Sequence, residues 1–237
     1  MRGYAVTHPP GRAVLPIEAG WDQLLYAESG AMTVSTATGT WVIPAHRALW
    51  VPDGAPATVT NRSRVAVRTL YFGAALRVLP VDVRAVNVPS LTRTLVLHAV
   101  QSCPLRLDDP IQAALVTVLT DQLRRLPEVG LRLPWPRDPR AADAARTIVA
   151  DAAIGLSDVA GRVGASRRTL ERAFAADTGL SLGAWRRRAN ILNSLDSLAA
   201  GRSVTATAVA AGYTTPSAYV AAFRRELGHT PRQYLRP

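Results

Sequence analysis

The sequence predicts a two-domain α+β protein with a β-rich N-terminal part and an entirely helical C-terminal part. Short runs of β-forming residues, separated by turn signals, fill residues 1–80. A helix-turn-helix pattern occurs twice within residues 139–237. Between these parts lie a helical extension at residues 81–126 and a proline-rich stretch at residues 127–138, which is typical of a stiff linker.

Six runs of β-forming residues predict strands in the N-terminal part. They are Leu24–Ala27, Met32–Thr36, Thr40–Ile43, Ala48–Val51, Ala57–Thr60 and Val65–Phe72. Turn sequences such as Pro52-Asp53-Gly54 separate the runs. Short strands at even spacing favour a sandwich or a small closed barrel over residues 1–80.

The extension at residues 81–126 contains two predicted helices, over 89–101 and 110–126. Pro110 is suited to the first turn of the second helix, with Asp109 as its N-cap. Its leucines recur with helical period, including Leu115, Leu119 and Leu123. This stripe predicts either a homodimer surface or packing within the chain, and the sequence leaves both open.

The net charge of +11 comes entirely from arginine, since the chain has no lysine. Residues 139–237 hold 14 Arg against 7 acidic residues, so the excess is greatest in the repeated part. The forked guanidinium group suits phosphate and guanine. Cys103 is the only cysteine, which excludes a disulfide within one chain. We see neither a signal peptide nor a membrane span, and expect a cytoplasmic protein.

The repeat in the C-terminal part has an offset of 48 residues, which becomes 49 after the turn glycine. Each copy has a short helix, a glycine turn and a second helix with aromatic anchors. The first copy is marked by Ala160, Gly164, Leu170, Phe174, Gly179 and Trp185, and the second by Ala208, Gly212, Tyr219, Phe223, Gly228 and Tyr234. Two such motifs on an arginine-rich segment predict binding to double-stranded DNA.

In the first copy, Ser157 and Ser166 are predicted to cap the two helices. Arg168 and Arg172 are four residues apart and share the outer face of the second helix, where they can reach guanine or phosphate. Glu171 lies four residues after Arg167 and three after Arg168, so it can orient those two arginines or accept a hydrogen bond from a cytosine amine.

A long helix over residues 181–200 is predicted to connect the copies, with Arg186 near its start. The outer face of the second reading helix is less charged, since it presents Ser217, Ala218 and Ala221 before Arg224. We therefore expect the first copy to carry most base readout and the second to anchor. The predicted DNA contacts are Ser166, Arg167, Arg168, Glu171, Arg172, Arg186, Thr215, Ser217, Ala218, Ala221 and Arg224.

Residues 139–237 resemble the DNA-binding domain of the AraC/XylS family of bacterial transcription regulators. The matching stretches are GASRRTLERAFAADTG, WRRRANILNSLDSLAAG and VAAGYTTPSAYVAAFRRELGHTPRQYLR. The resemblance implies two helices entering successive major-groove segments on one face of DNA. It places Arg168, Glu171 and Arg172 at base-reading positions of the first helix, and Ser217, Ala218 and Ala221 at those of the second. Many relatives have Arg where this chain has Ala221.

Residues 1–80 are similar to the cupin-like barrel that precedes such a domain in many relatives. The similarity lies in DQLLYAESGAMTV and GTWVIPAHRALWVPDGAPATV. The histidines of metal-binding cupins are missing, so we expect no metal and no cofactor. An effector pocket is predicted from five aromatic residues of the barrel: Trp21, Tyr26, Trp41, Trp50 and Tyr71.

The sequence thus predicts a transcription regulator, an activator or a repressor, rather than an enzyme. Its expected partners are double-stranded DNA, a small-molecule effector, a second copy of the chain and, for an activator, RNA polymerase. No membrane partner and no catalytic residues are expected. The alternatives are a metal-dependent cupin enzyme and an architectural DNA-binding protein without an effector.

Overall fold

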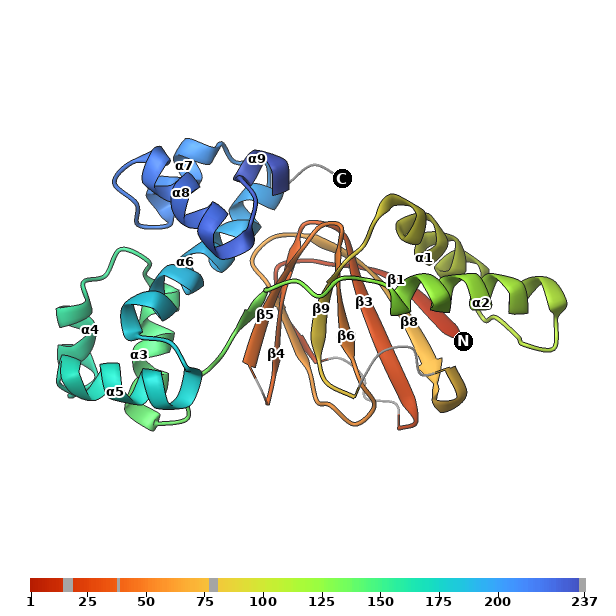
Figure 1. Ribbon diagram of the computed structural model, residues 1–237, viewed down its shortest axis with the longest axis horizontal. Coiled ribbons are helices and arrows are strands. Elements are labelled where there is room, and N and C mark those ends of the chain that lie inside the picture. Colours follow the sequence, from red (N-terminus) through yellow and green to blue (C-terminus); the bar gives the residue numbers. More distant parts are fainter. Residues whose placement is uncertain (15–18, 38, 77–80, 235–237) are drawn as a thin grey trace. The chain divides into compact units, whose positions relative to one another are not determined.

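The computed structural model describes residues 1–14, 19–37, 39–76 and 81–234 (Figure 1). The chain divides between Leu131 and Arg132 into two compact units, with a few residues near position 40 grouped with the second. We call them the N-terminal and C-terminal units. The first contains antiparallel sheets and two long helices, and the second is mostly helical, so the two-domain α+β prediction is confirmed.

The strands form two five-stranded sheets with the orders β1-β8-β3-β6-β9 and β10-β5-β4-β7-β2. Neither sheet closes on itself, so the predicted closed barrel is not confirmed. The strands are β1 (Arg2–His8), β2 (Gly11–Val14), β3 (Trp21–Ser29), β4 (Ala31–Thr36), β5 (Gly39–Pro44), β6 (Arg47–Val51), β7 (Thr58–Asn61), β8 (Val65–Gly73), β9 (Arg84–Asn87) and β10 (Arg132–Leu133). All six predicted strands are present, as β3 to β8.

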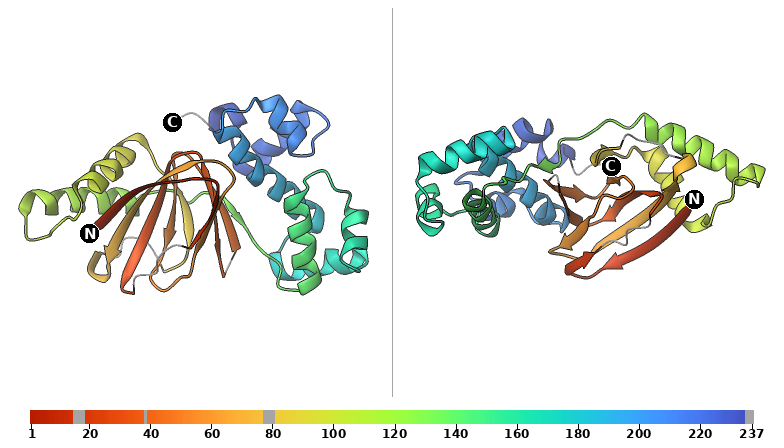
Figure 2. Two further views of the ribbon diagram at one scale, coloured as in Figure 1. Left: turned by 180° about the vertical axis from the view of Figure 1, so that it is seen from behind. Right: turned by 90° about the horizontal axis from the view of Figure 1, so that it is seen from below.

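Two helices, α1 (Ser90–Ser102) and α2 (Pro110–Arg124), pack on the first sheet (Figure 2). One hydrophobic core joins them to β3, β6, β8 and β9. Leu119 and Leu123 are fully buried in this core, and Leu115 packs against it. These leucines therefore do not form a dimer surface, because the sheet needs an apolar cover and the α2 stripe supplies it.

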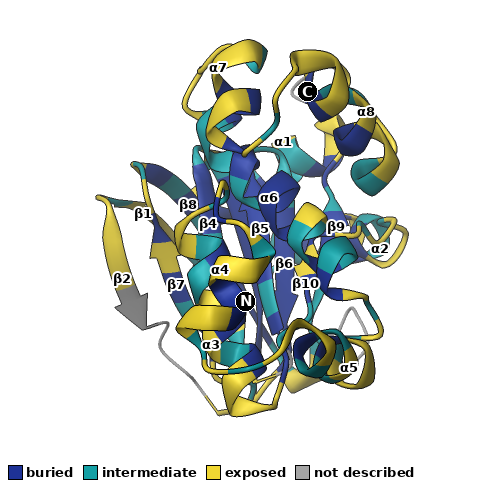
Figure 3. Ribbon diagram, turned by 90° about the vertical axis from the view of Figure 1, so that its left-hand side faces the viewer, coloured by how far each residue is buried: buried dark blue, intermediate teal, exposed yellow. Residues whose placement is uncertain are grey.

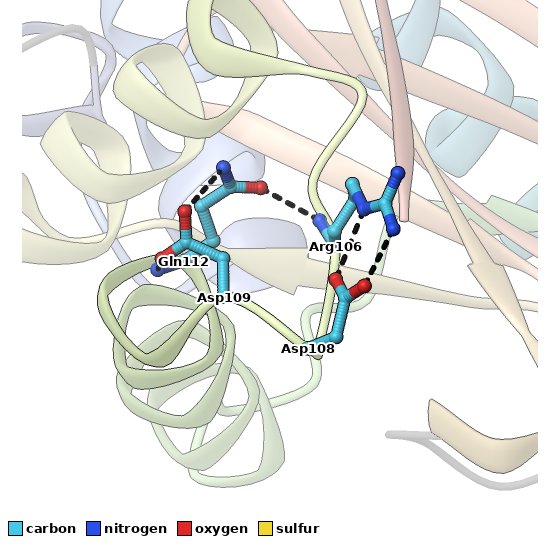
Figure 4. A network of polar contacts seen from close by, with 4 residues as sticks. All are labelled: Arg106, Asp108, Asp109 and Gln112. Carbon is cyan, nitrogen blue, oxygen red and sulfur yellow. Dashed lines mark hydrogen bonds and ion pairs between the residues drawn. The ribbon is translucent and has the colours of Figure 1, made fainter.

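A closed polar network holds the turn before α2 (Figure 4). Asp109 accepts hydrogen bonds from the N–H groups of Ile111 and Gln112, which confirms it as the N-cap. The Gln112 side chain donates to Asp109 and accepts from the Arg106 N–H. Arg106 also donates two hydrogen bonds to Asp108 and lowers the pKa of that carboxyl group. The network thus links the loop residues Arg106 and Asp108 to the first turn of α2.

The C-terminal unit has seven described helices, and Figure 1 shows the longest of them running from one helix cluster to the other. They are α3 (Pro139–Ala150), α4 (Leu156–Arg162), α5 (Arg167–Thr178), α6 (Leu182–Ala199), α7 (Val204–Ala210), α8 (Pro216–Leu227) and α9 (Pro231–Tyr234). Clusters α3–α5 and α7–α9 contain the two helix-turn-helix motifs, and α6 is the connecting helix. Ser181 caps α6 as an N-cap.

The segment before α3 is fastened to the C-terminal unit. The Trp185 indole N–H donates to the carbonyl of Pro134 at 2.6 Å, and the Trp135 ring stacks edge-on against the Trp185 ring. The N–H groups of Arg137 and Asp138 both donate to the Asp177 carboxylate, which lowers its pKa. The proline-rich residues closest to α3 therefore belong to the folded helical unit.

Candidate DNA-binding interface

The first helix-turn-helix consists of α4 and α5. Ser166 caps α5 by accepting the N–H of Thr169 at 3.1 Å, as predicted. Gly155, and not Ser157, occupies the N-cap of α4, which begins one residue before the predicted cap and has no side-chain cap bond. On α5, Leu170 and Phe174 are buried, and the Phe174 ring packs edge-on against Trp185 of α6. The inner face thus anchors α5 and leaves its other face outside.

The outer face of α5 presents Arg167, Arg168 and Arg172 to solvent. Among the described residues, Arg168 and Arg172 have no hydrogen-bond or ion-pair partner, so their guanidinium groups are unoccupied. Arg167 differs, since its Nε lies 3.8 Å from Glu171 Oε1. Two unpaired arginines one helical turn apart can bind guanine edges or phosphates without first breaking an ion pair.

Glu171 has a structural contact that the sequence did not indicate. Its Oε2 accepts a hydrogen bond from the backbone N–H of Leu182, the first residue of α6, at 3.0 Å. This N–H is one of the helix-terminal donors that lack an intrahelical partner. The carboxylate is therefore shared between the start of α6 and Arg167, whereas the sequence analysis assigned it to arginines or a base.

The second helix-turn-helix consists of α7 and α8. Thr215 caps α8 by accepting the N–H of Ala218 at 3.2 Å, and Pro216 occupies the first turn. Tyr219 and Phe223 are buried. The Tyr219 hydroxyl shares a 2.7 Å hydrogen bond with Ser194 of α6, and burial raises its pKa to about 12. Each second helix is thus held to α6 by aromatic side chains.

The outer face of α8 lines a shallow groove. Ser217, Ala218, Ala221 and Arg224 are exposed, as is Thr215 at the cap. The residues that line the groove are Pro216, Ser217, Val220, Ala221, Arg224, Arg225 and Thr230. The groove lining thus combines apolar side chains, Val220 and Ala221, with two arginines, Arg224 and Arg225.

Arg186 is placed differently from the other predicted contacts. It is half-buried, and its Nη2 donates to the carbonyl of Ala152 in the α3–α4 loop at 3.0 Å. Its neighbour Arg187 is exposed. In the structure, therefore, Arg186 serves an internal contact, and Arg187 is the arginine of this cluster that faces solvent.

A second groove contains basic residues that the sequence analysis missed. It is lined by Arg202, Ser203, Val204, Thr205, Val220, Thr230, Pro231 and Arg232. Arg202 lies two residues before α7, Arg232 is the second residue of α9, and both are exposed. The sequence signal was available, because Arg202 precedes the cap Ser203 and Arg232 follows Pro231. What the sequence could not show is that these distant positions meet in one groove.

The two reading helices, by which we mean α5 and α8, lie on the same side of α6. Figure 3 shows α5 and α8 on one side of the C-terminal unit and α4 and α7 on the other. The two reading helices therefore belong to one side of the C-terminal unit. A surface of this form can meet DNA at two places at once.

The five aromatic residues predicted to line an effector pocket are distributed over different environments. Tyr26 and Trp50 are fully buried in the core beneath α1 and α2. Tyr71 packs edge-on against Tyr4, and Arg2 lies over the Trp21 ring. Trp41 lies on the second sheet, with Arg132 over its ring. The structure does not bring these five side chains together.

Within the described ranges, no group of three or more His, Cys, Asp or Glu side chains is arranged to hold a metal ion. None of the described helices combines the length and the apolar character needed to cross a membrane.

Comparison with known proteins agrees with this geometry. Residues 159–237 match a family described as a helix-turn-helix domain. The chain is 28% identical over 219 residues to the HTH-type transcriptional regulator NimR of Escherichia coli K12, covering 90% of this chain and 79% of NimR. It is also 35% identical over 104 residues to the HTH-type transcriptional regulator RipA of Corynebacterium glutamicum. This match covers 43% of this chain and 31% of RipA.

Among solved structures, an AraC-type DNA-binding regulator from Chromobacterium violaceum covers 40% of this chain and 88% of its own, with 23% identity and a TM-score of 0.39. The family match falls on the two helix-turn-helix motifs described above. Residues 159–237 therefore form a helix-turn-helix domain, and the chain that carries it is a DNA-binding transcription regulator.

Proposed function

We propose that this regulator reads two successive major-groove segments on one face of DNA, one with α5 and one with α8. The observation that carries the proposal is the pair of unpaired arginines, Arg168 and Arg172, on an exposed helix whose counterpart α8 lies on the same side of α6. Helices in successive major-groove segments of one face are about one helical turn of DNA apart.

The two reading helices contact different chemical groups of the DNA. Arg168 and Arg172 on α5 select guanine through its O6 and N7 acceptors. Ala218 and Ala221 on α8 carry no donor and contact thymine methyl groups instead. Thr215, Ser217 and Arg224 bind phosphates beside α8, and the groove with Arg202 and Arg232 extends this backbone contact. The first motif thus supplies most of the sequence preference.

The other expected partners of this regulator remain predictions. A small effector, a homodimer and contact with RNA polymerase are each consistent with a regulator, and none has a defined site among the described residues. Because the proposed partner is chromosomal DNA, we place the chain in the cytoplasm.

A selection from random duplex DNA tests the proposal. We expect the purified full chain to enrich a two-part motif, with guanines in the part that α5 reads. Arg172→Ala should then cost about 1–3 kcal/mol on the selected site and less on random DNA. Arg167→Ala is the matched control, because Arg167 is partly engaged by Glu171 and should lose less.

Two outcomes would oppose the proposal. Enrichment of no motif would favour an architectural DNA-binding protein. Equal losses for Arg172→Ala on selected and random DNA would show that Arg172 contacts only the backbone.

A further inference from the structure

Asn190, in the middle of α6, contacts segments of both helix-turn-helix motifs. Its side-chain Nδ2 donates to the carbonyl of Ala152 in the loop before α4 and to the carbonyl of Ala211 in the turn after α7, each at 3.2 Å. The residue is 6% exposed. Because both neighbours are carbonyl oxygens, only the NH₂ end of the amide can face them. One buried amide thus joins the two motifs.

A close backbone approach strengthens this junction. A Cβ atom added to Gly212, in the turn between α7 and α8, would lie 2.7 Å from the carbonyl oxygen of Ala152. The turn of the second motif therefore lies directly against the loop of the first. Gly164, at the same place in the first motif, has a similar φ of +61° but nothing within 4 Å of such a Cβ. The contact belongs to the second turn alone.

The Ala152 carbonyl is the centre of the junction. It accepts hydrogen bonds from Arg186 Nη2 and Asn190 Nδ2, and Gly212 packs against it. We call Ala152, Asn190, Ala211 and Gly212 the junction. Loss of the Asn190 amide would leave the carbonyl of buried Ala211 without its side-chain donor. Such a loss is costly where water is excluded.

We infer that Asn190 is a positioning residue that fixes the separation and rotation of α5 relative to α8, and thereby the spacing of the two DNA segments. A helix as long as α6 can bend, so it does not by itself hold its two ends in register. The junction adds a second connection beside α6, from the loop of the first motif to the turn of the second. This inference rests on the proposed two-segment reading.

The property to measure is the spacing between the two DNA segments. Because DNA is helical, a change in this spacing also rotates one segment relative to the other. One helical turn of about 10–10.5 base pairs spans about 34–36 Å, so a single base pair changes both the distance and the facing direction of the second segment. A rigid reader should therefore accept one spacing, and a loosened reader should accept several. A residue that supports folding alone would not change this preference.

The experiment uses the full chain and the two-part site obtained by selection. Duplexes carry the native spacing or one base pair more or less, and further duplexes have either segment scrambled. The variant is Asn190→Leu. The control is Asn193→Leu, the same substitution three residues along α6, at a half-buried asparagine whose side chain has no hydrogen bond among the described residues.

The wild-type protein and Asn193→Leu should both lose about 10-fold or more in affinity when the spacing changes by one base pair, because one segment's contacts are then lost. Asn190→Leu should bind the native spacing about 10-fold more weakly and show at most about a 3-fold difference among spacings. Its affinity for duplexes with one segment scrambled should stay within about 2-fold of wild type.

An unchanged spacing preference in Asn190→Leu would overturn the inference, as would an equal loss on single-segment and two-segment duplexes. Asn190→Ser, which keeps a small polar side chain that cannot reach both carbonyls, provides the same test if the leucine variant does not fold. A wild-type protein without any spacing preference would instead contradict the proposed function itself.

Discussion

The carboxylate of Glu171 accepts a hydrogen bond from the backbone N–H of Leu182 at 3.0 Å. Glu171 is on α5 and Leu182 is the first residue of α6, so one side chain fastens the reading helix to the connecting helix. The same carboxylate lies 3.8 Å from Arg167 Nε through its other oxygen. Arg167 is thus partly restrained by Glu171, whereas the guanidinium groups of Arg168 and Arg172 are available to contact DNA.

Replacing Glu171 separates its structural contact from base reading. Glu171→Ala should lower the free energy of unfolding by about 1–2 kcal/mol, because the Leu182 N–H loses a charged acceptor. Glu171→Gln keeps an oxygen acceptor and should cost less than about 0.5 kcal/mol. Urea denaturation measures both. A changed base preference in Glu171→Gln, found by repeating the selection, would show that Glu171 reads a base directly.

The two turn glycines form a matched pair for stability. Gly164 and Gly212 have φ values of +61° and +78°. Gly164→Ala should cost about 1–2 kcal/mol from the left-handed backbone alone, since nothing lies near the added methyl group. Gly212→Ala should cost at least about 1 kcal/mol more, because the methyl group meets the Ala152 carbonyl. Equal costs in thermal unfolding would mean that the close approach at Gly212 does not exist in solution.

The salt dependence of DNA binding should show whether the groove lined by Arg202 and Arg232 contacts the phosphate backbone. Each phosphate that the protein neutralises contributes about −0.9 to the slope of log affinity against log salt concentration. Arg202→Ala and Arg232→Ala should each make the slope less steep by about 1, with similar effects on all DNA sequences. Arg146→Ala is the control, because Arg146 is paired with Asp143 on α3. Fluorescence anisotropy at several salt concentrations gives the slopes, and unchanged slopes would remove this groove from the interface.

Alkaline pH should destabilise the second motif through Tyr219. Its folded pKa is raised to about 12 by burial, against a usual value of about 10. The folded state therefore keeps a proton that the unfolded state loses, so this contribution to stability is full below pH 10 and falls between about pH 10 and 12. Absorbance titration of the wild-type protein should show a late-ionising tyrosine that is missing in Tyr219→Phe, whereas Tyr26 and Tyr213, whose pKa values burial also raises, stay in both curves. Identical titration curves would place the Tyr219 hydroxyl in contact with water.

Much of the helical structure of both units could be predicted because its signals are local. Ser166, Ser181 and Thr215 cap the helices they precede, and Asp109 and Asp138 do the same before Pro110 and Pro139. A cap depends on a few neighbouring residues, so the sequence shows it directly. The exception is Ser157, where α4 begins one residue earlier behind an uncapped Gly155.

What the sequence did not show depends on contacts between distant residues. The bond from Glu171 to Leu182 spans 11 residues, and the bond from Asn190 to Ala152 spans 38. The leucine stripe of α2 showed an apolar face, but not that the sheet already covers it. The sequence analysis did not predict strands β1 and β9, because their own residues carry no clear strand signal. Their extended conformation depends on pairing with β8 and β6.

Hydroxyl-radical footprinting on the selected DNA site tests the central claim most directly, since it shows where the bound protein covers the backbone. The two reading helices on one side of α6 predict two protected patches on the same face of DNA, about one helical turn, or 10 base pairs, apart. A single protected patch, or two patches on opposite faces of the duplex, would contradict reading by α5 and α8 together.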